Sequence, residues 1–323
     1  MSTITSSDNI HPMPIVVLVP VKNESWILDR FLAVTSQFAD KIIIADQMSS
    51  DHTRNIAIQY DKVHLIENNN AEYDEHFRQS LLLERARELV PGDKVLLALD
   101  ADEVITADSL HSADWVTIFS APKGTRIYFE KPDLVFPLTK CIRHDDYHLL
   151  GFIDDGSAHA GKKIHSPRLP GNSYSPLLYI EHIKFMHYAR VRNIEYRSRQ
   201  RYYSVIENIN GTRPFYGRLR AYSDQMDYLE TRQKVSTPDA WITGWEKMGI
   251  DMTSVYMTDH NYFNLYVLDS LRRYGGRRFF LDDIWSFDWN AFQQSIYGGG
   301  QKRIETPNIL YALVKTVAIK ILQ

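Results

Sequence analysis

The sequence has very little cysteine and no long apolar segment. Cys141 is the single cysteine among 323 residues, which excludes an intrachain disulfide framework and a zinc site built from cysteines. No apolar run approaches the roughly 20 residues that cross a bilayer. The segment Met1–Pro12 also lacks the basic and then apolar pattern of a signal peptide. We therefore expect a cytoplasmic protein.

An excess of positive charge is missing as well. The formal net charge is −3, which argues against nucleic acid as the main partner. The composition is 44% hydrophobic and 24% charged, which is typical of a folded protein with a sizeable core. Aromatic residues are spread unevenly, because 15 of the 19 tyrosines lie between Tyr174 and Tyr311. The two halves of the chain are therefore built differently.

In the first 130 residues, short aliphatic runs alternate with helical patterns. The runs are typical of strands buried on both faces of a parallel sheet, and they are Ile15–Val21, Lys41–Ala45, Val63–Ile66, Lys94–Leu99 and Arg126–Phe129. Apolar residues at helical spacing predict helices around 27–38, 53–60 and 77–90. This alternation predicts an α/β fold with a mostly parallel sheet flanked by helices. The sequence predicts loops for residues 131–185 and mainly helices from about Asn193 onward.

Acidic residues follow three of the predicted strands. The first strand leads into Glu24, the second leads into Asp46, and the fourth leads into Asp100, Asp102 and Glu103. Ligands of an open parallel sheet bind beyond the carboxyl ends of its strands, where these carboxylates would repel each other without a cation. Carboxylate oxygens suit Mg²⁺ or Mn²⁺, and such an ion can neutralise a departing diphosphate. The alternative is a solvated acidic loop, or a helix N-cap at Asp102.

Three short motifs occur in a fixed order in this part of the chain. They are Val19-Pro20-Val21-Lys22-Asn23-Glu24, then Asp46-Gln47-Met48-Ser49-Ser50-Asp51-His52-Thr53, then Leu99-Asp100-Ala101-Asp102-Glu103. In this order and spacing, over roughly residues 13–105, they resemble the family 2 glycosyltransferases with their nucleotide-sugar-binding GT-A fold. The resemblance implies a Rossmann-like GT-A domain over residues 13–192. A helical C-terminal region over residues 193–323 would then bind the acceptor or lie near a membrane.

The resemblance also implies which residues hold the nucleotide. Pro20 and Val21 would lie along the nucleobase, and Glu24 would meet the ribose. Asp46 would accept a hydrogen bond from the base, which suits uracil N3–H. Arg78 lies in the helix region where the family often has a basic residue near the nucleotide, and a surface salt bridge is its alternative role.

A second group of residues is implied for the metal. Asp100 would face the ribose or the metal, and Asp102 would ligate Mn²⁺ or Mg²⁺. His187 matches a histidine–aromatic step that ends this part of the fold in relatives, and in some of them this histidine completes the metal shell. A structural histidine held by hydrogen bonds is the alternative.

The catalytic base is not given by a clear motif match, because no acidic pair corresponds to the one found in many relatives. The candidates lie in the middle segment and are Asp145, Asp146, Asp154 and Asp155. We take Asp155 or Asp154 as the base that removes the proton of the acceptor hydroxyl. An ordinary Asp-Gly turn at these positions is the alternative.

Two segments of the C-terminal half allow several interpretations. The stretch Arg190–Arg220 holds eight arginines and no lysine. It can pair with a diphosphate or an anionic acceptor, bind single-stranded nucleic acid, or form a solvated helix face. The segment Ile309–Leu322 is apolar on most faces, and it either docks on the protein's own core or lies on a membrane surface near a lipid-linked acceptor.

The resemblance implies a metal-dependent glycosyltransferase. It would move a sugar from a UDP-linked nucleotide-sugar to a hydroxyl of a glycan or lipid-linked acceptor, and the resemblance implies inversion at the anomeric carbon. One alternative is a GT-A protein that binds a nucleotide or glycan without turnover. The other is a nucleotidyltransferase, against which the absence of a glycine-rich phosphate loop after the first strand counts. We expect no nucleic-acid partner, and at most a peripheral contact with the inner face of the membrane.

Overall fold

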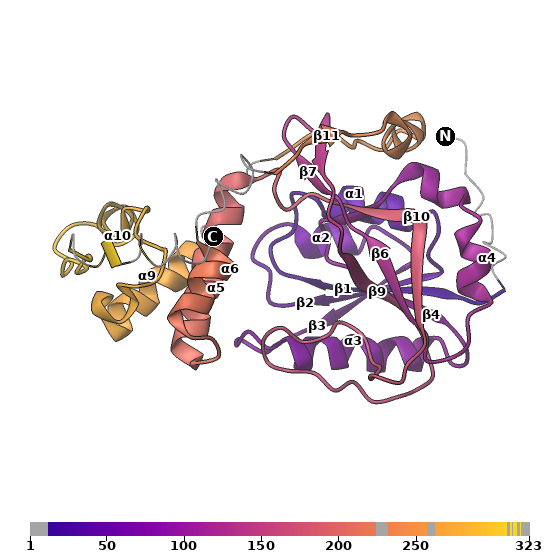
Figure 1. Ribbon diagram of the computed structural model, residues 1–323, viewed down its shortest axis with the longest axis horizontal. Coiled ribbons are helices and arrows are strands. Elements are labelled where there is room, and N and C mark those ends of the chain that lie inside the picture. Colours follow the sequence, from indigo (N-terminus) through magenta and orange to yellow (C-terminus); the bar gives the residue numbers. More distant parts are fainter. Residues whose placement is uncertain are drawn as a thin grey trace. The chain divides into compact units, whose positions relative to one another are not determined.

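The computed structural model describes residues 12–223, 232–256 and 262–308, together with residues 311, 313, 314 and 317 (Figure 1). The described chain forms two compact units. The first contains the residues through Val191 and those from Lys234 to Tyr256, and the second contains Arg192–Gln233 and the residues from Tyr262 onward. The first change from one unit to the other lies between Val191 and Arg192. Residues 234–256, which the sequence assigned to the C-terminal region, pack with the first unit instead.

An 11-stranded sheet forms the centre of the first unit, in the order β11-β8-β7-β10-β6-β9-β4-β1-β2-β3, with β5 paired to β10. The strands are β1 (Ile15–Val21), β2 (Lys41–Asp46), β3 (Val63–Glu67), β4 (Val95–Ala98), β5 (Glu103–Ile105), β6 (Arg126–Glu130), β7 (Asp133–Val135), β8 (Lys140–Ile142), β9 (Tyr147–Ile153), β10 (Leu177–His187) and β11 (Val235–Ser236). Strands β1, β2, β3 and β4 are parallel, and β6 and β10 run in the same direction because both are reached through the antiparallel strand β9. These six strands therefore end at one common edge.

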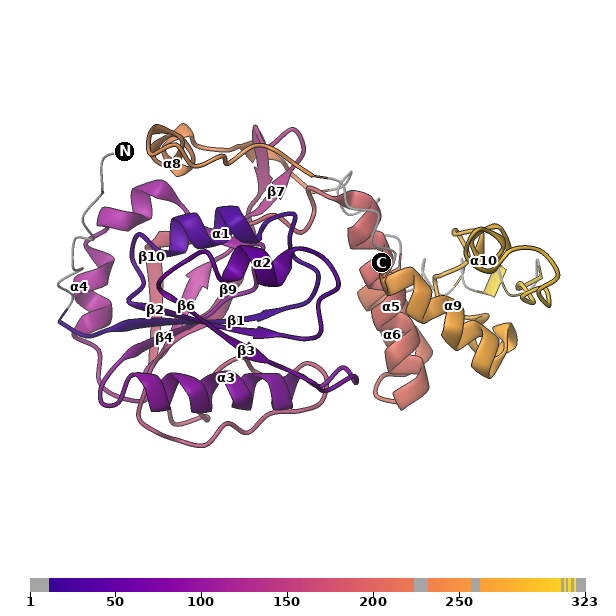
Figure 2. The same cartoon turned by 180° about the vertical axis from the view of Figure 1, so that it is seen from behind.

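Helices cover both faces of this sheet (Figures 1 and 2). Helices α1 (Leu28–Thr35) and α2 (Thr53–Ala57) lie on one face, and α3 (Glu75–Leu89) lies on the other. Side chains alternate along β1, so Val17 and Val19 belong to one buried cluster and Val16 and Leu18 to the other. The first unit also contains the short helices η1 (Ala107–His111), α4 (Asp114–Phe119), η2 (Asp239–Trp241) and α8 (Thr243–Lys247). Burial on both faces explains the near-continuous aliphatic runs in the sequence.

The predicted α/β class with a mostly parallel sheet is confirmed, and each of the five predicted runs forms a strand. The prediction of loops over residues 131–185 is wrong, because β7, β8, β9 and β10 lie there. β10 has 11 residues but no regular alternation of buried and exposed positions, and its register with β6 shifts between Ile180 and Lys184. The sequence of such an irregular strand lacks the alternation of polar and apolar residues from which a strand is predicted.

The second unit is helical in its described residues. Its elements are α5 (Asn193–Asn210), α6 (Phe215–Tyr222), α9 (Tyr262–Tyr274), η3 (Gly276–Phe279) and α10 (Trp289–Tyr297). Three arginines of the arginine-rich stretch, Arg192, Arg201 and Arg218, are buried in it. Arg201 donates to Asn264 Oδ1 at 3.2 Å, and Arg218 donates to Asp282 Oδ1 at 2.6 Å. Arg201 therefore joins α5 to α9, and Arg218 joins α6 to the segment after η3, so neither forms a solvated face.

Most of the predicted C-terminal segment Ile309–Leu322 lies outside the described residues. Within the residues that are described, none of the helices has both the length and the apolar character needed to cross a membrane.

Candidate functional site

The common edge at which the parallel strands end carries most of the predicted site residues. Asp46 is the last residue of β2, Asp100 and Asp102 follow β4, and His187 is the last residue of β10. Because β2, β4 and β10 run in the same direction, the sheet brings these side chains to one side of the unit. This is the edge at which open α/β sheets bind ligands.

The loops after β1 and β2 are hydrogen-bonded to each other. The backbone N–H of Asn23 donates to Ser49 Oγ at 2.8 Å, and the Asn23 side chain accepts from the backbone N–H of Ser50 at 2.8 Å. The N–H of Glu24 donates to Thr53 Oγ1 at 2.8 Å, and Asp51 accepts from the N–H of Ser25 at 3.1 Å. Most polar residues of the first two motifs therefore build the frame of the site.

Asp46 is buried at the end of β2, beside Val21 in the strand register. Its Oδ2 accepts from Arg54 Nη1 at 3.2 Å and from the backbone N–H of Ser49 at 3.3 Å. Its Oδ1 is buried, and no donor reaches it among the described residues. A buried acceptor without a donor costs about 1–3 kcal/mol, so a ligand that offers an N–H here would be favoured.

A small cavity lies between β1, β4 and α3. Pro20, Arg78 and Asp100, three residues predicted to contact the nucleotide, line it together with Arg168. Arg78 also stacks over the ring of Tyr73, with its guanidinium carbon 5.2 Å from the ring centre. Glu24, which was predicted to meet the ribose, accepts a hydrogen bond from Trp26 Nε1 at 2.8 Å.

Arg168 is a site residue that sequence analysis missed. Its guanidinium donates to Asp100 Oδ2 and to Glu103 Oε2, each at 2.5 Å. The loop that carries Arg168 is anchored on the start of α3, because Glu75 accepts from the backbone N–H of Ser166 at 2.8 Å and its own N–H donates to Lys163 O at 3.0 Å. Arg168 also donates to the carbonyl of Ala98, which is 70 positions away in the sequence. No local sequence pattern indicates contacts over such a separation.

Glu103 is fully buried beneath this cluster. Lys131 Nζ lies 2.7 Å from its Oε1, and Arg168 holds its other oxygen. Burial raises the pKa of Glu103, but the charges of Arg168 and Lys131 outweigh burial and hold the pKa well below its ordinary value. Glu103 is therefore a structural anion that positions Arg168 next to Asp100.

Asp102 and His187 face each other at the same edge. His187 Nε2 lies 3.8 Å from Asp102 Oδ2, and His187 Nδ1 lies 2.6 Å from Asp133 Oδ1. Asp133 is also held by Arg190 Nε at 2.6 Å and by His144 Nε2 at 3.1 Å. A carboxylate on one ring nitrogen orients the other nitrogen of a histidine, as it does in many metal sites.

The described residues contain no group of three or more His, Cys, Asp or Glu side chains arranged to hold a metal ion. Two ligands of one Mg²⁺, each at about 2.1 Å, can be at most about 4.2 Å apart. The separation of 3.8 Å between His187 Nε2 and Asp102 Oδ2 is below this limit but longer than the distance of about 3.0 Å between adjacent ligands of an octahedral ion. The pair could therefore hold an ion after a small side-chain movement, with the other ligands from a substrate and water.

His148 on β9 is a further residue near this cluster that sequence analysis did not single out. Burial, followed by the positive charge of Lys131, lowers the pKa of His148 to about 4. Its imidazole is therefore neutral at pH 7 and adds no positive charge to the site.

Asp154 and Asp155 do not lie with the other predicted site residues. β9 is antiparallel to β4, with Ile153 opposite Val95, so both aspartates lie at the edge where β4 begins. Lys94 and Asp100 are six residues apart along the chain, or about 20 Å in extended conformation at about 3.3 Å per residue. Asp154 forms ion pairs with Arg87 at 2.8 Å and Lys94 at 2.9 Å. Asp155 accepts from the backbone N–H of Ser157, as expected for the alternative of a turn.

Comparisons with known proteins give structural similarity only. No family model matches the chain, and no curated protein matches it. TarS residues 1–349 from S. aureus, solved in complex with UDP, is 20% identical over 37% of this chain and 36% of that chain, with a TM-score of 0.30. Glucosyl-3-phosphoglycerate synthase from Mycobacterium tuberculosis, solved with Mn²⁺, UDP and glucosyl-3-phosphoglycerate, is 16% identical over 38% of this chain and 44% of that chain, with a TM-score of 0.27. The chain thus spans less than half the length of these two structures.

Proposed function

We propose that the first unit is the catalytic domain of a metal-dependent glycosyltransferase with a GT-A fold, similar to family 2. It would move a sugar from a UDP-linked donor to a hydroxyl of a glycan or lipid-linked acceptor, with inversion. The observation that carries this proposal is the meeting of Asp46, Asp100, Asp102 and His187 at the carboxyl edge of the sheet. Their order along the chain follows the motifs that resemble the family.

Asp46 suits uracil better than cytosine. Its buried Oδ1 is an acceptor that lacks a donor among the described residues, and uracil N3–H is a donor. Cytosine has an acceptor at the same ring position, so two lone pairs would face each other. Pro20 and Val21 would lie along the base, and Glu24 and Asp100 would face the ribose.

Asp102 and His187 would hold a divalent ion, with Asp133 orienting the imidazole through its 2.6 Å contact. Mg²⁺ or Mn²⁺ bound there would neutralise charge on the diphosphate of the donor. Arg78 and Arg168, which line one cavity with Asp100, would add positive charge beside the same group.

The group that accepts the proton of the acceptor hydroxyl is not assigned. Asp154 and Asp155 lie at the opposite edge of the sheet, which favours a structural role for both. This placement keeps open the alternative of a GT-A protein that binds a nucleotide-sugar without turnover. Hydrolysis of a UDP-sugar by the purified protein would decide in favour of an enzyme.

The donor site can be tested by thermal unfolding with UDP, CDP and GDP, each with and without Mn²⁺. We expect UDP with Mn²⁺ to raise the melting temperature most, because a ligand at 100 times its Kd adds about 2.7 kcal/mol to the stability of the folded state. Equal shifts for UDP and CDP would contradict the role of Asp46. The absence of a shift with all three nucleotides, with and without metal, would overturn the proposed function.

Replacing Arg168 with alanine is expected to weaken UDP binding about tenfold or more while uridine binding changes less. The reason is that a hydrogen bond to a charged group contributes about 1.5–3 kcal/mol, and uridine lacks the diphosphate. Isothermal titration of both ligands measures the difference. Arg85→Ala on the same side of the sheet is the control, because the ion pair of Arg85 among the described residues is a surface pair with Glu88 at 3.1 Å. An equal loss for UDP and uridine would show that Arg168 only supports the fold.

A further inference from the structure

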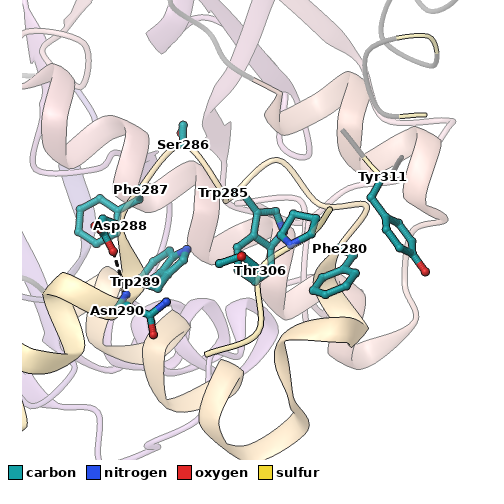
Figure 3. Close-up of a pocket in the computed structure, with 10 residues that line it drawn as sticks. Phe280, Trp285, Ser286, Phe287, Asp288, Trp289, Asn290, Thr306 and Tyr311 are labelled. Carbon is teal, nitrogen blue, oxygen red and sulfur yellow. Dashed lines mark hydrogen bonds between the residues drawn. The ribbon is translucent and has the colours of Figure 1, made fainter. Parts of the chain in front are cut away.

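The second unit contains a cavity of about 570 Å³ that lies outside the proposed donor site. It is lined by residues between Phe280 and Tyr311, from the segment around the start of α10 and the chain after it (Figure 3). This volume lies within the range of about 300–1,000 Å³ that is usual for sites of small ligands.

Aromatic rings form much of the lining. Phe280 packs edge to face against Trp285, with ring centres 5.7 Å apart, and against Tyr311 at 5.0 Å. Trp289 is buried, whereas Trp285 is half-buried and Tyr311 is 38% exposed. Trp285 Nε1 donates to Phe279 O at 2.9 Å, and Trp289 Nε1 donates to Ile284 O at 2.8 Å. The two indole rings are thus held in place by their own hydrogen bonds.

Polar groups lie among these rings. Thr306 lies between Trp285 and Trp289 in Figure 3. Asp288 caps α10 through Oδ1, which accepts from the N–H of Asn290 at 3.1 Å and of Ala291 at 2.9 Å. Among the described residues that line the cavity, Asp288 carries the only charge, and no Lys, Arg or His is present. These lining residues therefore offer no positive group to a phosphate, carboxylate or sulfate.

From these groups we propose that the second unit binds a neutral saccharide in this cavity. A pyranose ring has an apolar face of C–H groups, which packs on an aromatic ring, and hydroxyl groups at its edge. The hydroxyl groups would donate to the Asp288 carboxylate, which is a strong acceptor because it is charged, and pair with the Thr306 hydroxyl. An alkyl chain would offer neither the second carboxylate oxygen of Asp288 nor the Thr306 hydroxyl a hydrogen bond. This site goes beyond the proposed donor site and does not depend on it.

The test is binding of neutral oligosaccharides to the full chain. A printed array of neutral oligosaccharides built from glucose, galactose, mannose and N-acetylhexosamines selects the best ligand, which is then titrated calorimetrically. We expect Trp285→Ala, Asp288→Asn and Thr306→Val each to weaken this binding, with at least a tenfold loss for Trp285→Ala. Asp288→Asn keeps an N-cap residue and Thr306→Val keeps the side-chain shape, so these variants report on binding if Trp285→Ala does not fold.

Two controls separate this site from other surfaces. Tyr174→Ala removes the most exposed of the described tyrosines, at 93% exposure in the first unit, and is expected to leave saccharide binding unchanged. Saturating UDP is expected not to compete with the saccharide, which keeps a failure of this site distinct from a failure of the donor site. Saccharide binding that none of the three variants weakens would overturn the proposal. The absence of binding by every oligosaccharide on the array, or binding of alkyl probes alone, would overturn it equally.

Discussion

Replacing Asp102 with alanine is expected to abolish the Mn²⁺-dependent part of the UDP-induced thermal shift and to lower UDP-sugar turnover by at least about 100-fold. A bound metal ion contributes several kcal/mol to the stabilisation of a charged leaving group, and each tenfold change in rate corresponds to about 1.36 kcal/mol. Asp102 faces His187 Nε2 at 3.8 Å, and removal of the carboxylate leaves a single protein ligand from this pair. The thermal shift is measured with UDP alone and with UDP and Mn²⁺.

The control is Asp93→Ala, which removes an exposed carboxylate whose ion-pair partner among the described residues is Lys123 at the surface. It is expected to change neither the shift nor the turnover, because surface pairs of this kind contribute about 0–1 kcal/mol. His187→Gln is expected to weaken the Mn²⁺ response as well. A full Mn²⁺-dependent shift in folded Asp102→Ala protein would remove Asp102 from the metal site.

Replacing Asp154 with alanine is expected to destabilise the protein by about 3–5 kcal/mol without lowering UDP binding by the folded fraction. The side chains of Asp154 and Lys94 are 3% and 4% exposed and lie 2.9 Å apart, so the variant leaves a buried ammonium without this carboxylate. Chemical denaturation measures the free energy of unfolding, and calorimetry measures UDP binding. UDP binding is expected to remain because Asp154 lies at the edge of the sheet opposite Asp100.

Asp155→Ala is the matched control. Asp155 is next to Asp154 in the chain but is exposed, and among the described residues its carboxylate accepts a hydrogen bond from the backbone of the turn. We expect it to lose less than half the stability lost by Asp154→Ala. If either variant keeps its stability but loses UDP-sugar hydrolysis, the original assignment of the catalytic base to this pair is restored.

The Asp154 ion pair also predicts a dependence of stability on pH. Burial raises the pKa of Asp154, but the hydrogen bonds from Arg87 and Lys94 outweigh burial and lower the pKa below 3.8. Because the folded-state pKa is the lower one, the contribution of the pair is complete above the unfolded-state value and is lost as the pH falls through the folded-state pKa. Asp154→Ala protein should therefore show a smaller loss of stability between about pH 5 and pH 2 than the wild type.

The parallel part of the sheet could be predicted from the sequence because its strands are buried on both faces. Runs such as Ile15–Val21 are aliphatic along their whole length, and each is followed by turn residues or acids. The strands β9 and β10 could not be predicted, because they mix polar and apolar residues without a regular period. Backbone hydrogen bonds join both strands to β6, and these bonds depend little on which side chains the strands carry.

The residues of the candidate site likewise fall into those that the strand pattern predicts and those that it does not. Asp46, Asp100 and Asp102 follow predictable strands, so the direction of those strands was enough to place them at one edge. Arg168 reaches Asp100 from a loop 68 residues away, and Asp133 reaches His187 across 54 residues. The sequence also gives no local sign of the direction of β9. Because β9 runs antiparallel to β4, Asp154 lies at the edge of the sheet opposite Asp100, which the sequence did not predict.

The sequence by itself determined the α/β class, the parallel strands and the carboxylates at their ends, since these depend on local burial and on chain direction. Only the tertiary structure decided which charged groups meet, because ion pairs such as Arg168 with Asp100 join segments whose separation along the chain carries no pattern. The tertiary structure also collected the aromatic residues around Trp285 and Trp289 into a cavity. Packing between segments, which no local period encodes, created that space.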